Sequence, residues 1–120
     1  MGSFRVAVEV GNQAGGPLEP IEALVDTGAT YTWLPTDLLT RLGAEPEEQW
    51  PFVLADGREV TYPIGTVRLR FSGRTRSTVA VFGESNSEPL LGVVTLEELG
   101  LAADPVHRRL IPVPGLLKLA

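Results

Sequence analysis

The sequence predicts an all-β fold with one or two short helices. Its 13 glycines and 10 prolines separate short apolar runs, which is the punctuation of a β protein. Within several runs apolar residues alternate with polar ones, as at residues 4–10 and 65–71, and this period of two is typical of half-buried strands. Asp56-Gly57 stands between two strand-like runs and predicts a tight hairpin turn.

The expected strands follow one another at short intervals along the chain. They cover residues 4–10, 21–25, 31–34, 52–54, 59–64, 65–71, 78–82, 90–92 and 109–113. Residues 11–16 and Ser72-Gly73 are expected to be turns or loops between neighbouring strands. The sequence contains no internal repeat and no linker, so we expect one continuous domain.

Two short helices interrupt the expected strands. The first follows Thr36, a suitable N-cap residue, and stops at Gly43. The second begins with Thr95-Leu96-Glu97-Glu98, which has the capping-box pattern, and runs to about Leu99.

The composition is that of a single globular domain over residues 1–120. Hydrophobic residues make up 43% and charged residues 21%, and the length allows one core. No apolar run approaches the ~20 residues of a transmembrane helix. The N-terminus has no secretory pattern, so we expect a cytoplasmic protein without a membrane partner. The net charge of -5 argues against nucleic-acid binding. Since the chain has no cysteine and one histidine, His107, we expect no metal and no cofactor.

The most informative segment is an aspartate at the end of an apolar strand. Asp26 directly follows Ala23-Leu24-Val25, and an isolated carboxylate is costly to place there. The next three residues, Thr27, Gly28 and Ala29, are small, and together they can form a tight loop that brings backbone N–H groups to the carboxylate. A tripeptide is a weak signal by itself, and an Asx turn that caps the strand remains a serious alternative.

The surroundings of this loop resemble the retropepsin-like aspartic proteases. Their active-site signature is two apolar residues, Asp, Thr or Ser, Gly, and then Ala or Ser, and residues 24–29 fit it throughout. The family carries a second signature of two apolar residues and a glycine before a short helix, which Leu90, Leu91 and Gly92 match. The resemblance covers about residues 4–113 and is greatest to the single-domain bacterial and archaeal members.

The resemblance implies a closed β-barrel or sandwich with a hairpin flap over the active-site cleft. The segment Leu54, Ala55, Asp56 and Gly57 lies where that flap is expected. The resemblance also implies that Thr27 hydrogen-bonds across a two-fold axis and that Gly28 offers its carbonyl to substrate. The residues expected to line apolar subsites are Ala29, Val53, Leu54, Ala55 and Leu90, although ordinary core packing is an equally good account of each.

The chemistry of this family requires two carboxylates, and one chain supplies only one. One carboxyl must be ionised to accept a proton from water while the other is protonated to polarise the scissile carbonyl. Two carboxyls held close share one proton, as aspartic protease dyads in general do. Asp37, Asp56 and Asp104 do not lie in a second copy of the loop. We therefore expect a C2 homodimer with Asp26 from each chain, acting as an aspartic endopeptidase on peptide or protein substrates.

Some positions depart from the retroviral pattern. Thr30 stands where retroviral enzymes carry an aspartate, and Val93-Val94 replaces the usual Arg-Asn pair, so the inter-subunit salt bridges of those enzymes are not expected here. Tyr31 and Trp33 are interpreted mainly as core residues, although one face could approach a subsite. Two alternatives to a protease stay open: a non-catalytic homodimeric peptide-binding module on the same fold, and an unrelated small barrel with an accidental match.

Overall fold

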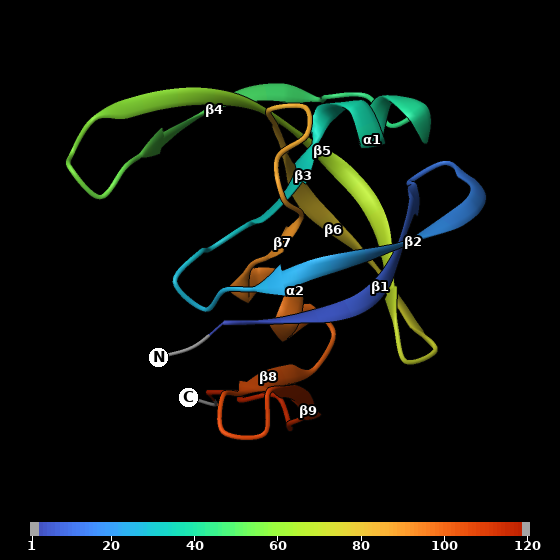
Figure 1. Ribbon diagram of the computed structural model, residues 1–120, viewed down its shortest axis with the longest axis vertical. Helices are drawn as coiled ribbons and strands as arrows, with labels where there is room; N and C mark the ends of the chain where they lie inside the picture. Colours follow the sequence, from blue (N-terminus) through green and yellow to red (C-terminus); the bar gives the residue numbers. More distant parts are fainter. Residues whose placement is uncertain (1–2, 119–120) are drawn as a thin grey trace.

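The computed structural model describes residues 3–118 and consists mainly of strands (Figure 1). The elements are β1 (Phe4–Asn12), β2 (Gly15–Val25), β3 (Thr32–Pro35), α1 (Thr36–Arg41), β4 (Glu48–Val53), β5 (Glu59–Phe71), β6 (Arg74–Gly83), β7 (Leu90–Leu91), α2 (Val93–Glu98), β8 (Leu101–Asp104) and β9 (Arg109–Pro112). The all-β prediction with short helices is confirmed. The ends of the expected domain, residues 1–2 and 119–120, lie outside the described part.

Within the described residues, six strands of the seven-stranded sheet close into a barrel. The order is β1-β2-β7-β3-β6-β5, and β5 then pairs back with β1, from Glu9 opposite Arg70 to Asn12 opposite Val67. An ion pair joins Glu9 and Arg70 across this closing contact, with 2.8 Å between Oε1 and Nε. Closure leaves the barrel wall without a free edge, which confirms the predicted closed barrel.

A hairpin arm projects from this barrel (Figure 1). It consists of β4 paired antiparallel with residues 59–64 of β5. Its turn is tight: the Leu54 N–H donates to the Arg58 carbonyl at 2.8 Å, and Gly57 has a φ of 89°, which favours glycine. The Asp56 carboxylate accepts the Arg58 N–H at 3.0 Å and so fixes the turn further. This is the hairpin predicted from Asp56-Gly57, in the position expected for a flap.

The barrel interior is apolar, apart from one group of hydroxyls. Its largest fully buried apolar side chains are Val10, Leu34, Leu39, Val67, Leu69, Leu91 and Leu99. They come from the strands, from the inner face of α1 and from the residue that caps the C-terminal end of α2, as expected of half-buried elements. Thr32, Thr78 and Thr95 are buried beside them and hydrogen-bond to one another.

Neither helix begins with the cap residue that the sequence predicted. The N-cap positions are Pro35 for α1 and Gly92 for α2, and neither makes a side-chain cap bond. Thr36 instead donates to the Gly83 carbonyl at 2.6 Å, and Thr95 lies inside α2 with its hydroxyl in the buried group. Both predictions were wrong because these hydroxyls have partners in distant strands, which a local pattern cannot reveal.

Other boundaries also differ from the predicted ones. β2 begins at Gly15, so the expected loop at 11–16 is a tight hairpin, and β8 was not predicted. β8 lacks alternation because all four of its residues are half-buried. Within residues 3–118, neither helix has the length and apolar character needed to cross a bilayer.

Truncation of the central core residue Leu34 to alanine should strongly destabilise the fold. Leu34 is 0% exposed in β3, so Leu34→Ala removes packed methyl groups and is expected to lower the free energy of unfolding by about 2–5 kcal/mol in urea denaturation. The matched control Leu117→Ala, at a residue that is 88% exposed, is expected to change it by less than about 0.5 kcal/mol. Equal effects of the two changes would contradict this description of the core.

Candidate active site

Asp26 stands at the end of β2, between the pairing partners β1 and β7. Its half-buried side chain follows the buried Val25, and its own N–H donates to the Leu91 carbonyl at 3.3 Å. The Gly28 N–H donates to Asp26 Oδ1 at 2.9 Å, and the Ala29 N–H donates to the Asp26 carbonyl at 3.1 Å. The loop therefore contains the Asx turn considered as an alternative. That turn orients the carboxylate, and the described residues give Oδ2 no hydrogen-bond partner.

The second signature lies directly behind this loop. The Val93 N–H donates to the Ala29 carbonyl at 2.9 Å, and the Val94 N–H donates to the Thr30 carbonyl at 3.0 Å. Gly92 allows this close approach, since a Cβ there would lie 2.4 Å from the carbonyl carbon of Tyr31. The two signatures thus form one structural unit in which the start of α2 fixes the shape of the aspartate loop.

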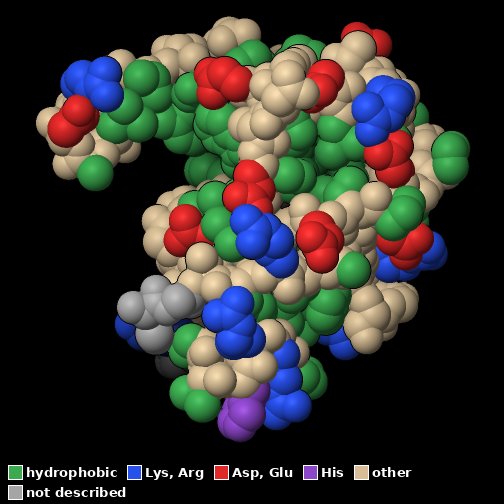
Figure 2. All heavy atoms as spheres, viewed as in Figure 1, with side chains coloured by type: hydrophobic (Ala, Val, Ile, Leu, Met, Phe, Trp, Pro, Cys, Tyr) green, Lys and Arg blue, Asp and Glu red, His purple; other side chains and the backbone are tan. Residues whose placement is uncertain are grey.

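A hollow of about 400 Å³ lies between this loop and the arm. Four of the five residues predicted to line subsites border it, namely Ala29, Val53, Leu54 and Leu90. Ala55 does not border it, because it lies in the exposed turn beyond the paired strands. Figure 2 shows the arm overhanging the body of the molecule, with hydrophobic side chains gathered on the barrel beside it. This hollow can hold an extended apolar segment.

Aromatic side chains join the arm to the barrel and line the same hollow. Tyr31 meets Phe52 edge-on at 6.2 Å between ring centroids, and Trp33 meets Tyr62 edge-on at 4.9 Å. The Tyr62 hydroxyl donates to Glu84 at 2.9 Å, and this hydrogen bond raises the pKa of the phenol. The sequence interpretation gave Tyr31 and Trp33 mainly a core role and left open that one face could approach a subsite; both residues border this hollow. Their alternation directly after the aspartate loop was the available signal.

A second hollow of about 380 Å³ lies on the other side of Asp26. It is bordered by Phe4, Val25 and the exposed Thr27, and by Ala103 and Pro105 at the end of β8. Asp26 borders this hollow, whereas Gly28 and Ala29 border the one under the arm. The aspartate loop therefore forms a ridge between two partly apolar depressions.

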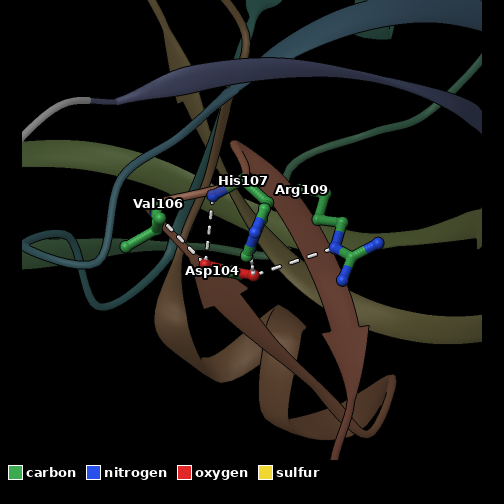
Figure 3. Close-up of polar contacts among 4 residues, drawn as sticks. All are labelled: Asp104, Val106, His107 and Arg109. Carbon is green, nitrogen blue, oxygen red and sulfur yellow. Dashed lines mark hydrogen bonds and ion pairs between the residues drawn. The ribbon is translucent and has the colours of Figure 1, made fainter.

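The turn after β8 is built around Asp104 (Figure 3). One carboxylate oxygen accepts the N–H groups of Val106 and His107, at 3.1 and 3.2 Å. The other lies 2.8 Å from His107 Nδ1 and 3.7 Å from Arg109 Nε. The hydrogen bonds from His107 lower the pKa of Asp104. His107 is exposed, and its contacts fix the turn beside the second hollow.

Arg5 and Thr30 bear on the expected departure from the retroviral pattern, and both are exposed. Arg5 pairs within the chain with Glu88, with 2.6 Å between Nε and Oε2. The lack of inter-subunit salt bridges stays a prediction. Among residues 3–118, no cluster of three or more His, Asp or Glu side chains is arranged to hold a metal ion.

The retropepsin-like aspartic proteases are defined by a closed barrel that carries an aspartate loop. A second signature packs behind this loop, and a hairpin arm lies above it. The sequence pattern of the aspartyl protease family matches residues 6–95, so the chain belongs to this family. Membership rules out an unrelated barrel with an accidental motif, and it supports a function in peptide hydrolysis.

One solved structure with this fold is EIAV protease in complex with the inhibitor HBY-793. It shares 22% sequence identity with this chain at a TM-score of 0.60, and the match covers 80% of this chain and 86% of that one. At this identity the likeness establishes the fold. No curated protein matches the chain significantly.

Replacement of Asp104 should destabilise the protein in a pH-dependent way. Because the pKa of Asp104 is lowered in the folded chain, its carboxylate stabilises the fold above the ordinary aspartate range, and this stabilisation disappears as the pH falls through the lowered pKa. Asp104→Asn is therefore expected to lower the Tm at neutral pH and to have less effect near pH ~3, as followed by circular dichroism. An equal loss of Tm at both pH values would contradict the assignment.

Proposed function

We propose that the chain is an aspartic endopeptidase in which Asp26 of two copies forms one catalytic pair. The observation that carries the proposal is the oriented but incompletely bonded carboxylate of Asp26. Its Oδ1 is held by the Gly28 N–H at the tip of a loop that borders an apolar hollow. Thr27 and Gly28 are both exposed at that tip, so a second loop has access to it.

The second copy is proposed to dock at the hollow on the far side of Asp26. Its apolar border includes Phe4, Val25 and Pro105. Val106, next in the β8–β9 turn, is 80% exposed, which supports an interface there because a partner chain would cover it. A two-fold axis beside Thr27 would bring the two Asp26 carboxylates together and let the Thr27 hydroxyls hydrogen-bond to each other.

In the proposed reaction a water molecule lies between the two Asp26 carboxyls. The ionised carboxylate accepts a proton from the water, and the oxygen of the water attacks the scissile carbonyl carbon. The protonated carboxyl donates to the carbonyl oxygen, which gives a neutral gem-diol. As the gem-diol collapses and its C–N bond breaks, one of its hydroxyls gives a proton to the carboxyl that is now ionised, and the other carboxyl gives its proton to the leaving nitrogen. The pair thus ends with one shared proton, as it began.

The substrate is proposed to be an extended peptide held under the arm. β4 is the edge strand of the sheet, so its outer backbone groups are available to pair with an added strand. The Gly28 carbonyl is proposed to accept a substrate N–H, and the hollow bordered by Val53, Leu54 and Leu90 would take an apolar side chain.

We propose that the chain works as one domain in the cytoplasm, as its sequence pattern suggests.

Cleavage of a diverse peptide mixture, read by mass spectrometry between mildly acidic and neutral pH, tests this function. The natural chain is expected to produce new peptide ends, and Asp26→Asn is expected to reduce the rate by at least about a hundredfold, because an amide cannot exchange the proton. Asp37→Asn is the matched control, since it makes the same chemical change at an exposed aspartate in α1 and should leave cleavage unchanged.

Two outcomes would contradict the proposal. Cleavage that persists in purified Asp26→Asn would place the catalytic group elsewhere. An absence of cleavage by the natural chain, from a sample shown to be dimeric, would favour the homodimeric peptide-binding module instead.

A further inference from the structure

Three buried threonine hydroxyls link the second signature to the protein surface. The Gly92 N–H donates to Thr32 Oγ1 at 3.1 Å. Thr32 Oγ1 lies 2.6 Å from Thr95 Oγ1, and Thr95 Oγ1 lies 2.8 Å from Thr78 Oγ1. Thr78 donates in turn to Glu98 Oε1 at 2.7 Å. The chain of hydrogen bonds therefore crosses from β3 to α2 and β6 and ends at a carboxylate.

The direction of these bonds follows from the number of protons. Each hydroxyl has one proton to donate, and that of Thr78 goes to Glu98. Thr95 must then donate to Thr78, and Thr32 must donate to Thr95. Since the proton of Thr32 is committed away from Gly92, its oxygen presents a lone pair to the Gly92 N–H. The carboxylate of Glu98 thus sets the orientation of the whole chain.

These hydroxyls are expensive to bury if they serve packing alone. Thr32, Thr78 and Thr95 are at most 2% exposed and are the buried polar side chains found among residues 3–118. Valine has almost the same shape and would fill the same space without the cost of removing a hydroxyl from water. A fully satisfied polar network in a core instead fixes one arrangement of the elements that it joins.

The element that this network fixes is the support of the aspartate loop. Gly92 follows Leu91, whose carbonyl accepts the Asp26 N–H. It precedes Val93 and Val94, whose N–H groups hold the carbonyls on the far side of the loop. A shift of Gly92 would therefore move all three of these hydrogen bonds at once.

We propose that Thr95, acting with Thr32 and Thr78, is a positioning residue for Asp26. It touches neither substrate nor the carboxylate, and it acts by holding the start of α2 against β3 and β6 so that residues 91–94 keep the aspartate loop in one shape. This inference rests on the proposed function in so far as loop shape governs catalysis, but its structural part does not.

The first test compares Thr95→Val with Thr95→Ser in steady-state kinetics. Loss of the hydroxyl in Thr95→Val is expected to lower kcat by roughly ten- to a hundredfold, because small misplacement of a reacting group is costly, while KM changes by less than about threefold. Thr95→Ser keeps the hydroxyl and is expected to restore most of kcat. Thr36→Val is the matched control, since it removes the hydroxyl bond to Gly83 outside this network.

The second test needs no substrate. Amide hydrogen exchange of Gly92, Val93 and Val94, measured by NMR, is expected to accelerate at least about tenfold in Thr95→Val relative to the amide of Leu69, a fully buried residue of β5. If Thr95→Val fails to fold, the same exchange measurement is made on Glu98→Ala and Glu98→Gln, at the exposed end of the hydrogen-bonded chain. Gln keeps an oxygen that accepts from Thr78 and Ala does not, so exchange is expected to be faster in Glu98→Ala.

The two tests separate failure of this inference from failure of the proposed function. The positioning role would be overturned if Thr95→Val left both kcat and exchange unchanged, or if exchange were equal in Glu98→Ala and Glu98→Gln. Either result would leave the protease proposal standing. Faster exchange in Thr95→Val, with no cleavage even by the natural chain, would support the positioning of the loop and contradict the protease proposal.

Discussion

The backbone hydrogen bonds between residues 26–30 and residues 91–94 are the constraint on which the rest of this structure depends. Three hydrogen bonds hold the two segments together: the Asp26 N–H donates to the Leu91 carbonyl, the Val93 N–H to the Ala29 carbonyl, and the Val94 N–H to the Thr30 carbonyl. They can form only because β2 and β7 run parallel side by side, with Leu24 opposite Leu90. The barrel therefore brings two short signatures from distant parts of the chain into contact and holds a carboxylate at their junction.

This arrangement also explains why the loop has two different sides. On one side the arm and the aromatic pairs that join it to the barrel enclose an apolar hollow beside Ala29, which suits a bound segment. On the other side the depression that Asp26 itself borders is bounded by Phe4 and by the turn that Asp104 holds together. In the proposed dimer one depression would hold substrate and the other would meet the partner, since one chain supplies only one of the two carboxylates.

The sequence predicted the features that depend on local pattern and missed those that depend on distant partners. Alternation located most strands, and Asp56-Gly57 located the turn of the arm. The two signatures could be found in the sequence, but their contact through Gly92 could not be seen because it depends on the barrel closing. Thr95 was predicted as a helix cap, and only the fold shows that its hydroxyl faces two other buried threonines.

The central claim, that one active site is made by two chains, is tested most directly by mixing. Natural and Asp26→Asn chains would be unfolded and refolded together at constant total concentration, with dimer formation verified, and peptide cleavage measured against the fraction of natural chain. If a site needs Asp26 from both partners, the rate should fall with the square of that fraction. A rate that falls in direct proportion to the fraction would show that one chain suffices and would contradict the account.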